Sequence, residues 1–85
     1  MHVIVPTHLR SYTRGESEVE ASGATLAEVL LDLEARFPGM RFRVVDEQDR
    51  IRPHVKFFVG GEETTALDTP VGEREVQIVA ALSGG

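Results

Sequence analysis

The sequence predicts an α+β fold in which a small mixed sheet packs against one main helix. One amphipathic helical pattern spans Thr25–Phe37, and runs rich in β-branched residues at His2–Pro6, His54–Val59 and Glu75–Ala81 are typical of strands. The element order is hairpin, helix, crossover, strand, short strand, strand. Covering one sheet face with the helix is the simplest way to bury its apolar side. We therefore expect the first strand to lie parallel beside the last.

A β-hairpin opens the chain. The first strand, His2–Pro6, ends at its proline, because proline cannot donate to a strand ladder. Arg10–Glu16 has the composition of a turn, and Ser17–Ala21 alternates weakly as the returning strand. Ser22–Ala24 then breaks the extended pattern.

The main helix has clear signals at both ends. Thr25 and Glu28 have the spacing of a capping box, and Pro38–Gly39 stops the helix. One face is apolar over its whole length and consists of Leu26, Val29, Leu30, Leu33 and Phe37.

The second half is expected to be a polar crossover followed by the remaining strands. The crossover, Met40–Arg52, has three apolar anchors, Val44, Val45 and Ile51, and a short helical turn near Arg41–Val45. The later segments are a turn at Gly60–Gly61, a brief pairing at Glu62–Ala66 and a loop at Leu67–Gly72.

Alternation along the strands predicts an apolar patch on the outer face of the sheet. If Phe57 faces the helix, Phe58 faces away from it, and the same alternation directs Val79 outward on the last strand. Together with Leu82, Phe58 and Val79 are expected to form a partner-docking surface. The alternative interpretation is ordinary scattered surface apolar residues.

The chain ends in Ser83-Gly84-Gly85 directly after the last predicted strand. We expect residues 1–81 to form the domain and residues 82–85 to be a flexible tail. A carboxylate is ionised at neutral pH and is a poor electrophile, so an enzyme must activate it, for example as an acyl-adenylate. Two terminal glycines leave the attacked carbon unhindered and let the tail enter a narrow slot.

Composition excludes several functions. The chain has no cysteine, which excludes a disulfide scaffold, a cysteine nucleophile and thiolate metal sites. A net charge of −5 argues against nucleic-acid and anionic-membrane binding. No signal peptide or membrane-length apolar run is visible, so we expect a cytoplasmic protein.

No constellation of catalytic or metal-binding residues stands out. The histidines His2, His8 and His54 fit no ligand spacing and have no evident carboxylate partner. Five arginines in and just before the crossover are interleaved with Asp46, Glu47 and Asp49, which is typical of a solvated mixed-charge surface; they are Arg36, Arg41, Arg43, Arg50 and Arg52. We expect neither a catalytic centre nor a metal site, and interpret the protein as one on which enzymes act.

The Val76–Gly85 end, the Thr25–Phe37 helix and the element order resemble the ubiquitin-like sulfur-carrier family over essentially the whole chain. This β-grasp group includes the small subunit of molybdopterin synthase and the thiamine sulfur carrier. The resemblance implies that Gly85 is adenylated by an E1-like enzyme with ATP and converted to a thiocarboxylate. It further implies that Gly84 and Ser83 give access, that Phe58, Val79 and Leu82 dock the partner, and that no cofactor is bound.

Several segments look similar to actinobacterial carriers that supply a cysteine synthase: Pro6–Arg10, Thr13–Gly15, Ala21–Leu26 and Asp32–Ala35. In that branch the thiocarboxylate attacks an activated serine derivative, and a metallopeptidase releases the product. Cysteine biosynthesis is therefore the favoured pathway, with molybdopterin, thiamine or secondary-metabolite thiolation as alternatives. Two other functions stay open: a ubiquitin-like modifier conjugated to lysines, and a non-covalent binding module.

Overall fold

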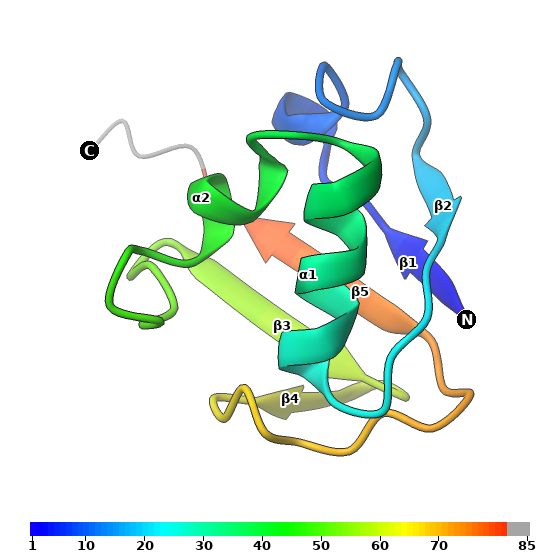
Figure 1. Cartoon of the computed structure of the whole chain (residues 1–85), viewed down its shortest axis with the longest axis vertical. Coiled ribbons are helices and arrows are strands. Elements are labelled where there is room, and N and C mark those ends of the chain that lie inside the picture. Colours follow the sequence, from blue (N-terminus) through cyan, green and yellow to red (C-terminus); the bar gives the residue numbers. More distant parts are fainter. Residues whose placement is uncertain (82–85) are drawn as a thin grey trace.

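The computed structural model describes residues 1–81, which form one sheet with its helices (Figure 1). In chain order the elements are β1 (His2–Ile4), η1 (a 3₁₀ helix, Thr7–Leu9), β2 (Glu18–Glu20), α1 (Leu26–Arg36), α2 (Met40–Val44), β3 (Val55–Val59), β4 (Glu62–Thr64) and β5 (Val76–Ala80).

The sheet has the strand order β2-β1-β5-β3-β4. β1 runs parallel to β5, with Val3 opposite Val76, and the other pairings are antiparallel. The prediction that the first and last strands lie parallel and adjacent is confirmed. β5 is hydrogen-bonded on both sides, so the strand that leads to the C-terminus is held at the centre of the sheet.

Helix α1 begins as its sequence predicts. The backbone N–H of Glu28 donates to Thr25 Oγ1 at 3.3 Å, which satisfies one of the free donors of the first turn. The Glu28 carboxylate reaches back to the N–H of Ala24 at 2.9 Å, one residue before the N-cap. The helix ends at Arg36, and Phe37 is its C-cap.

The core lies between α1 and one face of the sheet (Figure 1). Leu26, Val29, Leu30 and Leu33 are at most 1% exposed, as the helical periodicity predicts. They share the core with fully or nearly fully buried side chains of the three adjacent strands: Val3, Phe57, Val76 and Ile78.

The crossover contributes more core than its polar composition suggests. α2 spans Met40–Val44, one residue earlier than the predicted turn, and Met40 and Val44 are almost completely buried. After it, the Asp46 carboxylate accepts the N–H groups of Arg50 and Gln48, each at 2.9 Å. The hydrogen bond from Arg50, assisted by that from Gln48, holds the pKa of Asp46 below its ordinary value and so stabilises this tight turn.

The 3₁₀ helix η1 was not predicted, because its three residues are too short to show a period. The turns after it are organised by Thr13, a fully buried polar residue. Its hydroxyl contacts the carbonyls of Glu16 at 2.8 Å and Arg10 at 3.3 Å. η1 and these turns place His8 and Leu9 beside α2, where they form part of a site described below.

Gly23 is required by a close backbone approach. A Cβ at this position would lie 2.7 Å from the Val29 nitrogen and 2.9 Å from the Glu28 carbonyl carbon, both in the first turns of α1. We expect Gly23→Ala to lower the free energy of unfolding by about 2 kcal/mol, measured by urea denaturation.

The control is Gly15→Ala, since a Cβ there meets nothing within 4 Å and only the positive φ of 84° opposes the substitution. Its expected cost is about 1 kcal/mol. An equal or larger loss for Gly15→Ala would show that crowding at α1 does not explain Gly23.

Candidate functional site

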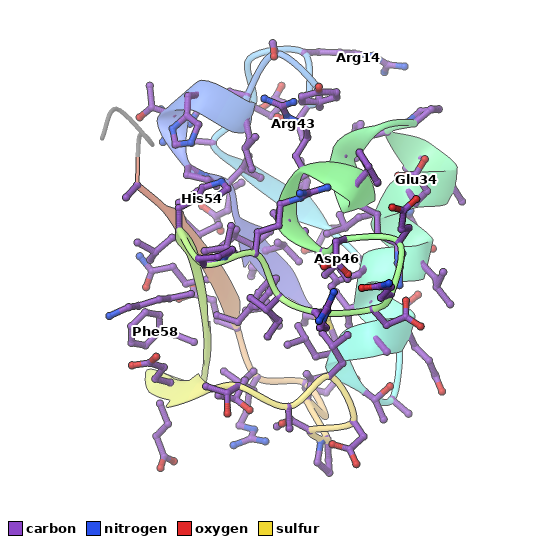
Figure 2. The ribbon with its side chains drawn as sticks, turned by 90° about the vertical axis from the view of Figure 1, so that its left-hand side faces the viewer. Arg14, Glu34, Arg43, Asp46, His54 and Phe58 are labelled. Atoms are coloured by element: carbon purple, nitrogen blue, oxygen red, sulfur yellow. The ribbon has the colours of Figure 1, made fainter. Side chains whose placement is uncertain are left out.

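The outer face of the sheet carries the predicted apolar pair. Phe57 is fully buried beneath the helix, whereas the next residue, Phe58, is half-buried on the opposite face, and Figure 2 shows Phe58 pointing away from the helices. Val79 is 38% exposed on β5. Because Phe58 lies opposite Gln77, Phe58 and Val79 are diagonal neighbours on antiparallel strands, within reach of an aromatic side chain. We call these two residues the outer patch.

A third apolar residue, which the sequence analysis did not include, lies on the same face, in the row of cross-strand partners that contains Phe58 and Gln77. Ile4 of β1 is opposite Gln77, so it faces the same side of the sheet and is half-buried. The row ends in a carboxylate at each edge, with Glu63 opposite Phe58 on β4 and Glu18 opposite Ile4 on β2. The outer patch therefore shares its face of the sheet with Ile4, with the polar residue Gln77 between Ile4 and Phe58 and a carboxylate on each edge strand.

The C-terminal end of β5 is fixed to β3. The N–H of Ala81 donates to the carbonyl of His54 at 2.9 Å, which continues the antiparallel pairing one residue past β5. Leu82, Ser83, Gly84 and Gly85 lie outside the described residues, so their roles in docking, tail access and sulfur transfer stay predictions.

A hollow of about 250 Å³ lies beside this end of β5. It is lined by His8 and Leu9 of the η1 segment, Phe42 and Arg43 of α2, and Arg52 and His54 of the segment before β3. We call it the exit hollow, because His54 also pairs with Ala81 at the point where the described chain ends.

Two contacts fix one side of the exit hollow. Arg52 Nε donates to the carbonyl of Phe42 at 2.7 Å, and its guanidinium lies over the Phe42 ring, 4.5 Å from the ring centroid. The Phe42 side chain is nevertheless 56% exposed. An aromatic ring held by an arginine and open to solvent is available to contact a partner.

The five arginines at the end of α1 and in the crossover divide into two groups. Three of the five form the mixed-charge surface that the sequence predicts: Arg36 pairs with Asp32 at 3.2 Å, Arg41 with Asp49 at 2.6 Å and Arg50 with Asp46 at 3.5 Å. Arg43 and Arg52 form no ion pair within residues 1–81 and line the exit hollow instead. The exit hollow therefore has no acidic lining residue to offset its arginines.

A larger groove, about 950 Å³, runs between α1 and the segments around β3 and β4. Its lining residues carry both charges, with Arg41, Arg50, Arg52 and Lys56 beside Asp49, Glu63 and Asp68. Its lining also includes apolar residues such as Leu31 and Leu67, and its mixed charges favour neither an anionic nor a cationic partner.

One expectation about the histidines is wrong. Sequence analysis found no carboxylate partner, yet His2 Nδ1 lies 3.0 Å from Glu18 Oε1 and 3.3 Å from Glu20 Oε1. The antiparallel pairing of β1 with β2, which places His2 opposite Glu20, brings these residues to one face. Among residues 1–81 no group of three or more His, Cys, Asp or Glu side chains is arranged to hold a metal ion.

A membrane-spanning helix is not found within residues 1–81, where each helix is too short or too polar to cross a bilayer.

The fold and the site define a β-grasp protein of the ubiquitin-like class, with a central final strand that leads toward a Gly-Gly end. The chain belongs to the ThiS family, whose model matches residues 3–85. The sulfur carrier protein CysO of Mycobacterium tuberculosis is 36% identical over an alignment of 89 positions, including gaps, which covers 98% of this chain and 96% of that protein.

Solved structures agree with this assignment. The crystal structure of Mycobacterium tuberculosis CysO matches with a TM-score of 0.88 and 33% identity, covering 95% of this chain and 98% of that one. The BexX/CysO complex of Amycolatopsis orientalis matches with a TM-score of 0.89 and 34% identity, covering 99% and 98%. A small archaeal modifier protein of Methanosarcina acetivorans, at 22% identity and a TM-score of 0.81, shares the fold alone.

Proposed function

We propose that this chain is a sulfur carrier that holds sulfur as a thiocarboxylate on Gly85 and delivers it in cysteine biosynthesis. The observation that carries the proposal is its relation to CysO sulfur carriers over nearly the whole chain, combined with a fixed central strand β5 that runs toward Gly84-Gly85. The chain acts as a protein co-substrate, and its enzyme partners supply the catalysis.

The proposed loading has two steps. An E1-like enzyme transfers AMP from ATP to the Gly85 carboxylate, which forms an acyl-adenylate and releases pyrophosphate. Hydrosulfide, or a persulfide carried by the enzyme, then attacks the carbonyl carbon, and AMP leaves with the electron pair of the broken C–O bond. A persulfide donor also requires a thiol to release the sulfur by disulfide exchange. ATP is bound by the activating partner, and a cytoplasmic location provides it.

The acceptor in this proposal is a cysteine synthase. The thiocarboxylate sulfur attacks the β-carbon of an activated serine derivative, the activating group leaves, and a cysteine adduct forms at the tail. The amine of the adduct then takes the acyl group from sulfur, which converts the thioester into an amide and frees the thiol. A metallopeptidase hydrolyses this amide with one water, which releases cysteine and regenerates the Gly85 carboxylate. Ser83 and Gly84 give these enzymes a narrow, unhindered approach to the reacting carbon.

The outer patch is the proposed contact with the activating enzyme, together with Leu82. Val79 is exposed on β5, the strand that leads to the tail, and Phe58 is half-buried on the neighbouring strand β3. The two residues are diagonal neighbours. Apolar side chains at such a position contribute to association by losing contact with water.

We expect Val79→Asp to lower kcat/KM for ATP-dependent activation by at least about tenfold, mainly through KM, because a carboxylate would be desolvated in an apolar contact. The rate of pyrophosphate release at varied carrier concentration measures this effect. Leu31→Asp is the matched control, since Leu31 is 58% exposed on α1, away from the outer patch. An unchanged kcat/KM for Val79→Asp, in a variant with normal thermal unfolding, would contradict docking through this patch.

The acceptor step tests the function as a whole. The chain, prepared with a C-terminal thiocarboxylate, is incubated with a cysteine synthase and its activated serine substrate, and its intact mass is measured. A mass increase equal to one cysteine in place of hydrosulfide supports the proposal. A thiocarboxylate that is not consumed, with lysine conjugates of the chain in lysate instead, would favour the modifier function.

A further inference from the structure

We propose that the exit hollow is a second docking site, which binds an acidic segment of the protein that receives the tail. This inference rests on the proposed function, because it assumes that a partner takes up the chain beyond Ala81. The candidate surface residues come from three segments of the chain and are His8, Phe42, Arg43, Arg52 and His54.

The first argument is charge. The chain carries a net charge of −5, and its acidic residues outnumber Lys and Arg by 14 to 9. Yet the exit hollow is lined by two arginines and has no carboxylate among its lining residues. Arg36, Arg41 and Arg50 form ion pairs with carboxylates, whereas Arg43 and Arg52 form none within residues 1–81. The charge of Arg52 nevertheless contributes to the lowered pKa of Asp46, so Arg43 is the cation of the hollow with no such neighbour among the described acidic groups whose pKa is shifted. A local concentration of positive charge on an acidic protein favours an anionic partner and faster association with it.

The second argument is position. The His54 carbonyl accepts a hydrogen bond from the N–H of Ala81, and His54 also lines the exit hollow. The exit hollow therefore adjoins the end of the last strand. Figure 2 shows His54 and Arg43 toward one end of the molecule, whereas Phe58 lies lower on the sheet. A partner that encloses the tail must pass this end of β5. The exit hollow therefore lies next to the last described residue of the chain, Ala81.

The third argument concerns the kind of anion. Phe42 is 56% exposed beside the Arg52 guanidinium, so the site presents an apolar ring among cations. A peptide segment has both carboxylates and carbon side chains to match this mixture, whereas a hydrated inorganic anion would leave the ring in water. The overall negative charge opposes binding of a nucleic acid. An acidic peptide segment is thus the occupant that fits.

The direct test uses a defined acidic probe. The ¹⁵N-labelled full-length chain is titrated with hexaglutamate, with hexaglutamine and with inorganic phosphate, and amide shifts are followed by NMR. We expect saturable shifts with hexaglutamate at His8, Arg43, Arg52 and His54 and none with hexaglutamine. Scattered shifts, no shifts, or equal affinity for phosphate would overturn the proposal.

Two charge-reversal variants, one inside and one outside the exit hollow, test the same site by enzyme kinetics. Arg43→Glu changes an exposed residue with no ion pair within residues 1–81, and Arg14→Glu makes the same change at an exposed residue outside the exit hollow. At low salt we expect Arg43→Glu to lower kcat/KM with the tail-receiving enzyme about tenfold and to abolish hexaglutamate binding, while Arg14→Glu changes neither. The kinetic difference should shrink as added salt screens the charges.

Equal effects of Arg43→Glu and Arg14→Glu would overturn the proposal, because only net charge would then matter. If no enzyme activates the wild-type chain, the proposed function fails, whereas the hexaglutamate titration still decides whether the exit hollow binds acidic peptide. The two failures are therefore distinguishable.

Discussion

Deletion of Gly85 is expected to abolish sulfur loading while the thermal unfolding midpoint stays within about 1 °C of the wild-type value. The buried core is built from residues between Val3 and Ile78, and the last described hydrogen bond of the chain is that of Ala81 with His54. Removal of Gly85 moves the terminal carboxylate to Gly84, one residue short of the proposed reacting position, without removing any described contact. Intact mass after incubation with ATP, a sulfur donor and the activating enzyme measures loading.

The control for this deletion is Ser83→Ala, which keeps the length of the tail and both terminal glycines. We expect it to load at close to the wild-type rate. Full loading of the Gly85 deletion would show that the terminal residue has no special role. A large fall in its unfolding midpoint would show that the end of the chain contributes to the fold.

Phe57→Ala is expected to cause the largest loss of stability, about 3–5 kcal/mol in the free energy of unfolding. Phe57 is fully buried on β3 and is the largest fully buried side chain of the described chain. A domain of this size has a total stability of roughly 5–15 kcal/mol, so the substitution is expected to remove a large share of it. Urea denaturation followed by circular dichroism measures the change in midpoint.

The neighbouring residue provides a matched control of the same type. Phe58 is half-buried on the outer face, so Phe58→Ala should cost about 1 kcal/mol but weaken activation, as Val79→Asp does. The two adjacent substitutions thus separate the stabilising face of β3 from its proposed docking face. An equal loss of stability in both variants would contradict this division.

Much of the fold is predictable from the sequence because its signals are local and strong. The Thr25 cap and the apolar period of Leu26–Leu33 determine α1, and the β-branched runs determine β1, β3 and β5. The parallel pairing of β1 with β5 follows from the element order. The short elements η1 and α2 were missed or displaced, because three to five residues do not establish a helical period.

Of the two candidate surfaces, the outer patch could be predicted from the sequence and the exit hollow could not. Alternation along a strand is enough to place Phe58 and Val79 on the outer face, and both placements are confirmed. The exit hollow was not predictable, since η1, α2 and the segment before β3 meet only through tertiary packing. In the sequence, Arg43 and Arg52 stand among acidic residues like their neighbours, and only the structure shows that they differ from Arg41 and Arg50 in having no carboxylate partner within residues 1–81.

The central claim is that the Gly85 carboxyl group carries sulfur, and intact-protein mass spectrometry of the full-length chain tests it most directly. The chain is incubated with ATP, sulfide and an E1-like enzyme of the ThiS-family system. The account predicts a mass gain equal to the exchange of one oxygen for one sulfur atom, localised to the C-terminal peptide and absent without ATP. An unchanged mass in a folded chain whose C-terminus is intact, with an enzyme shown to load another ThiS-family carrier, would contradict it.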